Sequence, residues 1–301
     1  AQFAVGQSDA GAALAAKLNL LAQTERCLCA VETSQIAAAV EVFNFDVELG
    51  IGANAGLQST TGGRIYDCIW DAGGNDTIVG ADNDVKLDGG DGNDTVLVGN
   101  NFNDSGNNAL LVDVEVVTLT ASGKTLNLGG QTESMTINGT GGVDTIVTGS
   151  GNNLIDANYG DDSVTTGIGN NTVFGASGAD SITANNGTNV IDAGTENDTI
   201  TAASGNNTIT AGDGNDTINL IHGTNSVMAG SGLDTITVTS GTNTIDAGDG
   251  ADVITLNAGN NTVYGSSGAD SISANNGTNV IDAGTEDDTI TANSGTNTIT
   301  A

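Results

Sequence analysis

Aliphatic residues recur every nine positions along the second half of the chain. From residue 137 to residue 299, each ninth residue is an isoleucine or a valine, with polar or small residues on both sides. An α-helix cannot place residues nine apart on one face with glycines between them, whereas a strand, a turn and a return strand can. The spacing therefore predicts coils of 18 residues, each with two short strands, around a core of stacked aliphatic side chains.

Two columns of polar residues occupy the turns before these strands. An aspartate precedes every second strand, and an asparagine stands at the equivalent place before the strands between them. The second inward position of the strands is mostly alanine, which predicts two sheets lying close together and a thin core. The aspartate column consists of Asp144, Asp162, Asp180, Asp198, Asp216, Asp234, Asp252, Asp270 and Asp288. The asparagine column consists of Asn153, Asn171, Asn189, Asn207, Asn225, Asn243, Asn261, Asn279 and Asn297.

Charge adds a constraint to this pattern. The 301 residues include 45 glycines and no proline, and the formal net charge is −32. A disordered acidic chain would be poor in β-branched residues, but this chain is rich in Ile, Val and Thr. From residue 133 onward there are 20 acidic residues and no lysine or arginine. Stacked aspartates repel one another, so compaction of this part requires a cation from outside.

The same charge narrows the classes of partner. Nucleic acid and anionic membrane surfaces carry negative charge and are unsuitable partners for so acidic a chain. No apolar run is long enough to span a membrane, so membrane insertion is not expected.

The aspartate turns resemble a known repeat. Residues 89–96 read GGDGNDTV and residues 211–218 read AGDGNDTI, and both are similar to the nonapeptide of the RTX (repeats-in-toxin) calcium-binding proteins. The resemblance implies an all-β fold, a parallel β-roll or β-solenoid, in which turn carbonyls and aspartate carboxylates bind multiple Ca²⁺ ions. By this resemblance the metal ligands are Asp76, Asp94 and the nine members of the aspartate column.

The asparagine turns depart from the family pattern. RTX rolls hold metal on both edges, but an asparagine column is neutral, and stacked side-chain amides can hydrogen-bond along the axis. We therefore expect calcium along one edge of the roll and an asparagine ladder along the other.

Three regions follow from these patterns. Residues 1–66 are expected to form a helical cap or an assembly segment, with helical stretches at 12–21 and 35–40. Residues 67–132 form an interrupted first roll with a β insert, whose expected strands are 112–120 and 125–128. Residues 133–301 form the regular calcium-binding roll, and its last coil ends without a polar cap, which suggests a longer protein or packing on another subunit.

No residue set predicts catalysis. Residues 69–78 are similar to the stretch that introduces the calcium roll of serralysin-type metalloproteases, but a chain whose one histidine is His222 lacks the His-Glu-x-x-His zinc helix. We expect a bacterial extracellular or cell-surface protein that leaves by type I secretion. Further resemblance to surface-layer, adhesin and fibre proteins implies a structural role with self-association between copies of the chain.

Two alternatives remain open. The chain could be a non-catalytic secretion and stability module of a longer secreted enzyme. More remotely, outward threonine pairs could form a flat ice-binding face, although Phe174, Met228, Tyr264 and Asp246 interrupt that array in the sequence.

Overall fold

The computed structural model describes residues 49–51, 56–58, 68–71, 74–79, 86–106 and 110–301. The regular structure within these residues is entirely β, and no helix there is long and apolar enough to cross a membrane. The helical stretches expected at 12–21 and 35–40 lie outside the described residues. The chain divides into two units, one comprising 1–102 with 108–117, the other 103–107 with 118–301.

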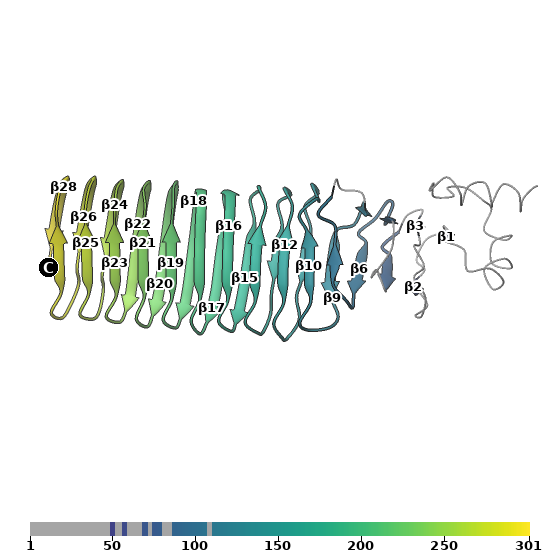
Figure 1. Ribbon diagram of the computed structural model, residues 1–301, viewed down its shortest axis with the longest axis horizontal. Coiled ribbons are helices and arrows are strands. Elements are labelled where there is room, and N and C mark those ends of the chain that lie inside the picture. Colours follow the sequence, from purple (N-terminus) through teal and green to yellow (C-terminus); the bar gives the residue numbers. More distant parts are fainter. Residues whose placement is uncertain (1–48, 52–55, 59–67, 72–73, 80–85, 107–109) are drawn as a thin grey trace, which may run out of the picture. The chain divides into compact units, whose positions relative to one another are not determined.

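The second unit is a stack of coils whose strands alternate between two sheets (Figure 1). We name them sheet D, whose strands from β12 onward follow the aspartates, and sheet N, whose strands from β13 onward follow the asparagines. Strand β18 (Thr199–Asp213) bends from sheet D into sheet N. Sheet D also contains β10 (Thr125–Leu128), β12 (Thr145–Thr148), β14 (Ser163–Thr166), β16 (Ser181–Gly187), β19 (Thr217–Leu220), β21 (Thr235–Val238), β23 (Val253–Leu256), β25 (Ser271–Ala274) and β27 (Thr289–Ala292). Sheet N also contains β11 (Thr136–Asn138), β13 (Leu154–Asp156), β15 (Thr172–Ser177), β17 (Val190–Thr195), β20 (Thr224–Ser231), β22 (Thr242–Asp249), β24 (Asn260–Tyr264), β26 (Thr278–Asp282) and β28 (Thr296–Thr300).

All strand pairs within this unit are parallel, and their register equals the sequence period. Ile218 pairs with Ile236 in sheet D, and Ile209 pairs with Val227 in sheet N, both 18 residues apart. The first pair of sheet D has a longer offset, because Thr125 pairs with Thr145 across an insertion of two residues. The predicted parallel β-roll of 18 residues per coil is confirmed.

The core is the aliphatic ladder. Its members from Ile137 to Ile281 are at most 2% exposed, and the alanines at the second inward position up to Ala283, such as Ala202 and Ala211, are fully buried. Strand alternation places these side chains inside and the intervening threonines and serines outside. In the last described coil, Ile299 is 43% exposed. The expected thin core is therefore present up to the last coil.

The first unit contains two runs of parallel strands. Strands β1 (Leu49–Ile51), β3 (Cys68–Asp71), β5 (Lys86–Asp88) and β8 (Leu111–Val112) pair in that order, and β2 (Gly56–Gln58), β4 (Thr77–Val79) and β6 (Thr95–Val98) pair in that order. Two strands, β7 (Phe102–Asn103) and β9 (Val116–Leu119), lie where the chain passes between the units.

One expected strand in this region was wrong. The alternating pattern over 112–120 predicts one strand, but β8 ends at Val112 and β9 begins at Val116. Asp113 between them adopts a left-handed conformation with φ 49°, which ends an extended segment. The expected strand at 125–128 is confirmed as β10.

The aliphatic ladder generates a stability prediction. Replacing Ile218 by Ala leaves a cavity among fully buried neighbours and should cost about 2–5 kcal/mol. Replacing Ile299, which is partly exposed, by Ala should lower the free energy of unfolding by less than about 1 kcal/mol. Urea unfolding of both variants in calcium, followed by far-ultraviolet circular dichroism, measures the difference. Equal costs for the two substitutions would contradict a core built from the stacked ladder.

Candidate calcium sites

A continuous hydrogen-bonded column joins the aspartates of the second unit. The backbone N–H of Asp198 donates to Oδ1 of Asp216 at 2.7 Å, and that of Asp216 donates to Oδ1 of Asp234 at 2.8 Å. The same bond recurs between all successive members from Asp144 to Asp288. The structure thus brings the nine predicted aspartates into one row, one coil apart.

The second carboxylate oxygen distinguishes the inner members of the row. Within the described residues, Oδ2 of seven of these aspartates is buried and has no hydrogen-bond donor. Burying a carboxylate oxygen without a hydrogen-bond donor costs folding free energy. Each of these oxygens is therefore expected to bind a proton or a cation. The seven are Asp162, Asp180, Asp198, Asp216, Asp234, Asp252 and Asp270.

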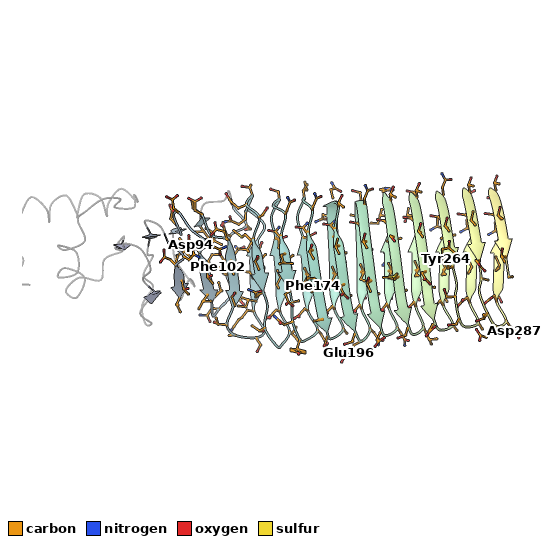
Figure 2. The ribbon with its side chains drawn as sticks, turned by 180° about the vertical axis from the view of Figure 1, so that it is seen from behind. Asp94, Phe102, Phe174, Glu196, Tyr264 and Asp287 are labelled. Atoms are coloured by element: carbon orange, nitrogen blue, oxygen red, sulfur yellow. The ribbon has the colours of Figure 1, made fainter. Side chains whose placement is uncertain are left out.

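The turns before these aspartates share an unusual backbone. Two residues adopt left-handed conformations, as at Gly212 (φ 113°) and Gly214 (φ 142°) before Asp216. The conformation persists where glycine is replaced, as at Glu196 (φ 82°), which Figure 2 labels on the edge of the stack. Such angles are costly for residues other than glycine, so the surrounding turn imposes them. The asparagine turns carry one left-handed residue instead, as at Gly205 (φ 104°) before Asn207.

Oxygen atoms from two coils converge at the start of the turn. A Cβ built on Gly175 would collide with both Oδ2 of Asp180 and the backbone carbonyl oxygen of Ala193 in the next coil. Gly265 repeats the arrangement with the Oδ2 of Asp270. A carboxylate oxygen and a carbonyl oxygen facing one small volume are the ligands that calcium prefers.

Side chains alone do not complete such a site. Among the described residues, no three His, Cys, Asp or Glu side chains gather into a metal-binding group. Ions bound between coils must therefore take most of their ligands from turn carbonyls, with the column supplying the carboxylates. The donor set present, one buried unpaired oxygen per coil beside left-handed turns, fits calcium on these terms.

Burial also changes the acidity of the metal-free column. Desolvation, followed by the charges of neighbouring acidic residues, raises the pKa of Asp162 and Asp198 to about 7. Desolvation likewise raises the pKa of Asp180, Asp234 and Asp252 to about 6. A metal-free column thus competes for protons near neutral pH.

The opposite edge carries the expected asparagine ladder. Asn207 Nδ2 donates to Oδ1 of Asn225 at 2.8 Å, and Asn225 Nδ2 donates to Oδ1 of Asn243 at 2.8 Å. The bond is continuous from Asn153 to Asn297. An amide both accepts and donates, so this column satisfies itself without a metal.

Asp144, the first member of the aspartate column, differs from the inner members. Its Oδ2 accepts hydrogen bonds from the N–H and the Oγ1 hydroxyl of Thr140 at 2.9 and 2.7 Å. Its Oδ1 accepts the N–H of Lys124, which occupies the place of an aspartate in the preceding coil. The carboxylate of Asp144 is therefore satisfied by protein donors alone.

The predicted upstream pair lies in the first unit. The N–H of Asp76 donates to Oδ1 of Asp94 at 2.8 Å, as in the main column. The N–H of Asp94 in turn donates to Oε2 of Glu115 at 2.7 Å, so Glu115 extends this row. Sequence reasoning missed Glu115 because it lies 21 residues after Asp94 instead of 18. Its position directly before β9 could have indicated that Glu115 belongs to the row, because the aspartates also lie directly before their strands.

The comparison with protein families agrees with this geometry. The family model described as RTX calcium-binding nonapeptide repeat (4 copies) matches residues 70–105, 138–173, 165–200, 192–220, 222–254, 237–272 and 273–301, more than half of the chain. The chain belongs to the RTX repeat family. RTX repeats bind calcium, so this RTX chain is a calcium-binding β-roll. No curated protein matches it.

The raised pKa values generate a prediction for the RTX roll without metal. A carboxyl whose pKa is higher in the folded state stabilises the fold at low pH, and this contribution disappears as pH rises through the folded pKa. In chelator, β structure should therefore be greater at pH 5 than at pH 8, with stability falling as pH rises from the ordinary carboxyl pKa of 3.8 up to the folded pKa of about 6 to 7. Circular dichroism across this range measures it.

A triple variant tests whether the pH dependence comes from the aspartate column and not from general repulsion among the acidic residues. Replacing Asp162, Asp180 and Asp198 together by Asn removes three of the titrating groups and should flatten the pH profile. A metal-free chain with equal β structure at pH 5 and pH 8 would contradict the assignment.

Proposed function

We propose that this chain is an extracellular structural module that folds when it binds calcium and has no catalytic activity of its own. The observation that carries the proposal is the row of buried carboxylate oxygens without donors along the aspartate edge. These charges repel one another in a metal-free coil, whereas calcium accepts six to eight oxygen ligands and can bridge them. Calcium would thus convert a repulsive column into a cohesive one.

The proposed location follows from calcium-dependent folding. Extracellular calcium modules have dissociation constants of roughly 10⁻⁴ to 10⁻³ M, so their sites are empty in the cytosol and filled outside. Because metal binding and folding are one event in such domains, the chain would leave the cell unfolded and fold after export. We propose a bacterial cell-surface or secreted location, with type I secretion as the route.

The mechanical role follows from the stack. Each coil contacts mainly its neighbours, and nine aspartate-bearing coils at a strand spacing of about 4.8 Å span roughly 40 Å. A rigid rod of this kind suits a spacer in a surface layer, a fibre or a large adhesin. Self-association of copies of the chain would extend it.

The proposal of no catalysis rests on the surroundings of His222. Its Nδ1 lies 2.6 Å from Oγ of Ser240 on the surface, and no described carboxylate forms a hydrogen bond with the ring. Hydrolase triads need that third, orienting group. The buried carboxylates of the column face the turns instead, where metal would engage them.

A second candidate is a secretion and stability module of a longer secreted enzyme. The similarity of residues 69–78 to the stretch that introduces serralysin-type rolls favours it. A catalytic domain in the full-length reading frame would support this second candidate over the first. Ordered sheets or filaments of the purified chain with calcium, seen by electron microscopy, would support the first.

Calcium-driven folding is tested directly by titration. Adding millimolar calcium to the full chain should change its circular dichroism from coil to β, and chelator should reverse the change. Magnesium at the same concentration should do little, because it demands a smaller octahedral site and retains its waters. A roll already folded in chelator at pH 8 would contradict the proposal.

A matched pair of variants tests which aspartates hold the metal. Asp216→Asn removes a carboxylate whose Oδ2 has no donor and should lower the number of bound calcium ions. Asp144→Asn alters a carboxylate already satisfied by Thr140 and Lys124 and should leave that number unchanged. Calorimetric titration counts the ions in both, and an equal loss in the two variants would refute the assignment.

A further inference from the structure

The two outer faces of the roll in the second unit have different chemistry. Eighteen side chains point outward from sheet D between residues 145 and 291; 15 are serine or threonine, and none is charged. The corresponding 18 positions of sheet N, between residues 154 and 300, hold eight serines or threonines, four aspartates and six large apolar or aromatic residues. The hydroxyl positions on sheet D are Thr145, Ser163, Thr165, Ser181, Thr183, Thr199, Thr201, Thr217, Thr235, Thr237, Thr255, Ser271, Ser273, Thr289 and Thr291.

The residues that interrupt the threonine pairs in the sequence do not lie on the hydroxyl face of sheet D. Phe174, Met228, Asp246 and Tyr264 all belong to sheet N. Figure 2 labels Phe174 and Tyr264 on the face of the stack, away from the turn edge that carries Glu196. Because successive strands alternate between sheets, threonine pairs that are nine residues apart in the sequence lie on opposite faces. The interruptions and the sheet D array therefore never share a surface.

The hydroxyls of sheet D are available to a partner. In the described part of the chain, no side-chain hydrogen bond involves any of the 15 serine and threonine hydroxyls of this face. All are at least partly exposed. The array is in strict register, with Thr199 beside Thr217 and Thr217 beside Thr235.

The array has a regular two-dimensional repeat. Neighbouring strands place hydroxyls about 4.8 Å apart along the stack, and alternate residues place them about 6.7 Å apart along a strand. The spacing along the stack is close to an oxygen repeat on faces of hexagonal ice. Figure 1 shows the strands keeping nearly the same direction along the second unit, so the repeat is not lost through twist.

The chemistry of the face selects among partners. It carries no charge in a segment with 20 acidic residues, so a cationic partner would bind elsewhere. It carries no aromatic ring, which a protein interface commonly uses as its anchor and a sugar ring uses as a stacking surface. A face of regular, uncharged hydroxyls and methyls matches a lattice of ordered water molecules instead.

We propose that the outer face of sheet D binds ice. Calcium would serve this activity by holding the coils in register, and the asparagine ladder would hold the opposite edge. The activity goes beyond the structural role proposed above and stands or falls separately from it, because a folded spacer without affinity for ice remains a spacer.

The test compares one substitution on two faces. Thr199→Tyr with Thr235→Tyr places two large side chains on sheet D, and Thr208→Tyr with Thr244→Tyr places them at the equivalent exposed positions of sheet N. Ice-crystal shaping and thermal hysteresis are measured with the full chain in calcium, after circular dichroism has verified that each variant is folded. We expect activity in the unaltered chain and the sheet N variant and its loss in the sheet D variant.

Three results would overturn the proposal. The folded chain could leave ice crystals unshaped, or the sheet N variant could lose as much activity as the sheet D variant. Alternatively, the sheet D variant could lose binding to crystalline cellulose or chitin, or dimerisation, while the unaltered chain shows no effect on ice. The first result would leave calcium-dependent folding intact, as circular dichroism of the same samples would show.

Discussion

The structure depends on how a carboxylate stacks on a carboxylate. Each inner aspartate accepts the N–H of the preceding coil through Oδ1, and this bond holds the coils in register. No N–H or hydroxyl group of the described residues reaches Oδ2, so this second oxygen is left buried without a donor. In the first coils, the asparagine Oδ1 likewise accepts the backbone N–H of the preceding coil. The asparagine also carries an NH₂ group, which donates to Oδ1 of the next asparagine. The two side-chain columns thus differ in one atom per coil, Oδ2 in place of Nδ2, and that atom makes the aspartate column dependent on a cation.

The need for a cation matters because the thin core of the roll contributes little stability. Alanines occupy much of the inward surface, so most strands bury one large aliphatic side chain, and only Leu220, Val238 and Leu256 add a second one among the regular coils. A core of this thickness is marginal without cross-links or metal. The first rung is an exception, because Thr140 and Lys124 satisfy Asp144 without an ion. The carboxylate of Asp144 therefore needs no ion, unlike those of the seven aspartates from Asp162 to Asp270.

Periodic features of this chain could be predicted from its sequence. The nine-residue spacing gives the strands, the inward Ile and Val, the parallel register and both polar columns, because every coil repeats the same local rule. The details that escaped prediction are those where one coil departs from the rule. Asp113 breaks an alternating segment, and three added residues place Glu115 out of frame.

Two further details depend on the three-dimensional path of the chain and could not be predicted from the sequence. Nothing in the pattern indicates that Thr140 would fold back onto Asp144, since this depends on the backbone path of one turn. The pattern likewise shows threonine pairs every nine residues but not which sheet each pair faces. Three-dimensional alternation of the strands was needed to separate the hydroxyl face from the face that carries Phe174 and Tyr264.

Cations are expected to bind at the aspartate edge only, and a crystal structure grown in calcium would show where they lie. Anomalous scattering locates each calcium ion without reference to the protein ligands. We expect a row of calcium ions between successive aspartate turns from Asp162 to Asp270 and none between the asparagine turns. Ions along both edges, or an ordered roll with no ion at the aspartate edge, would contradict it.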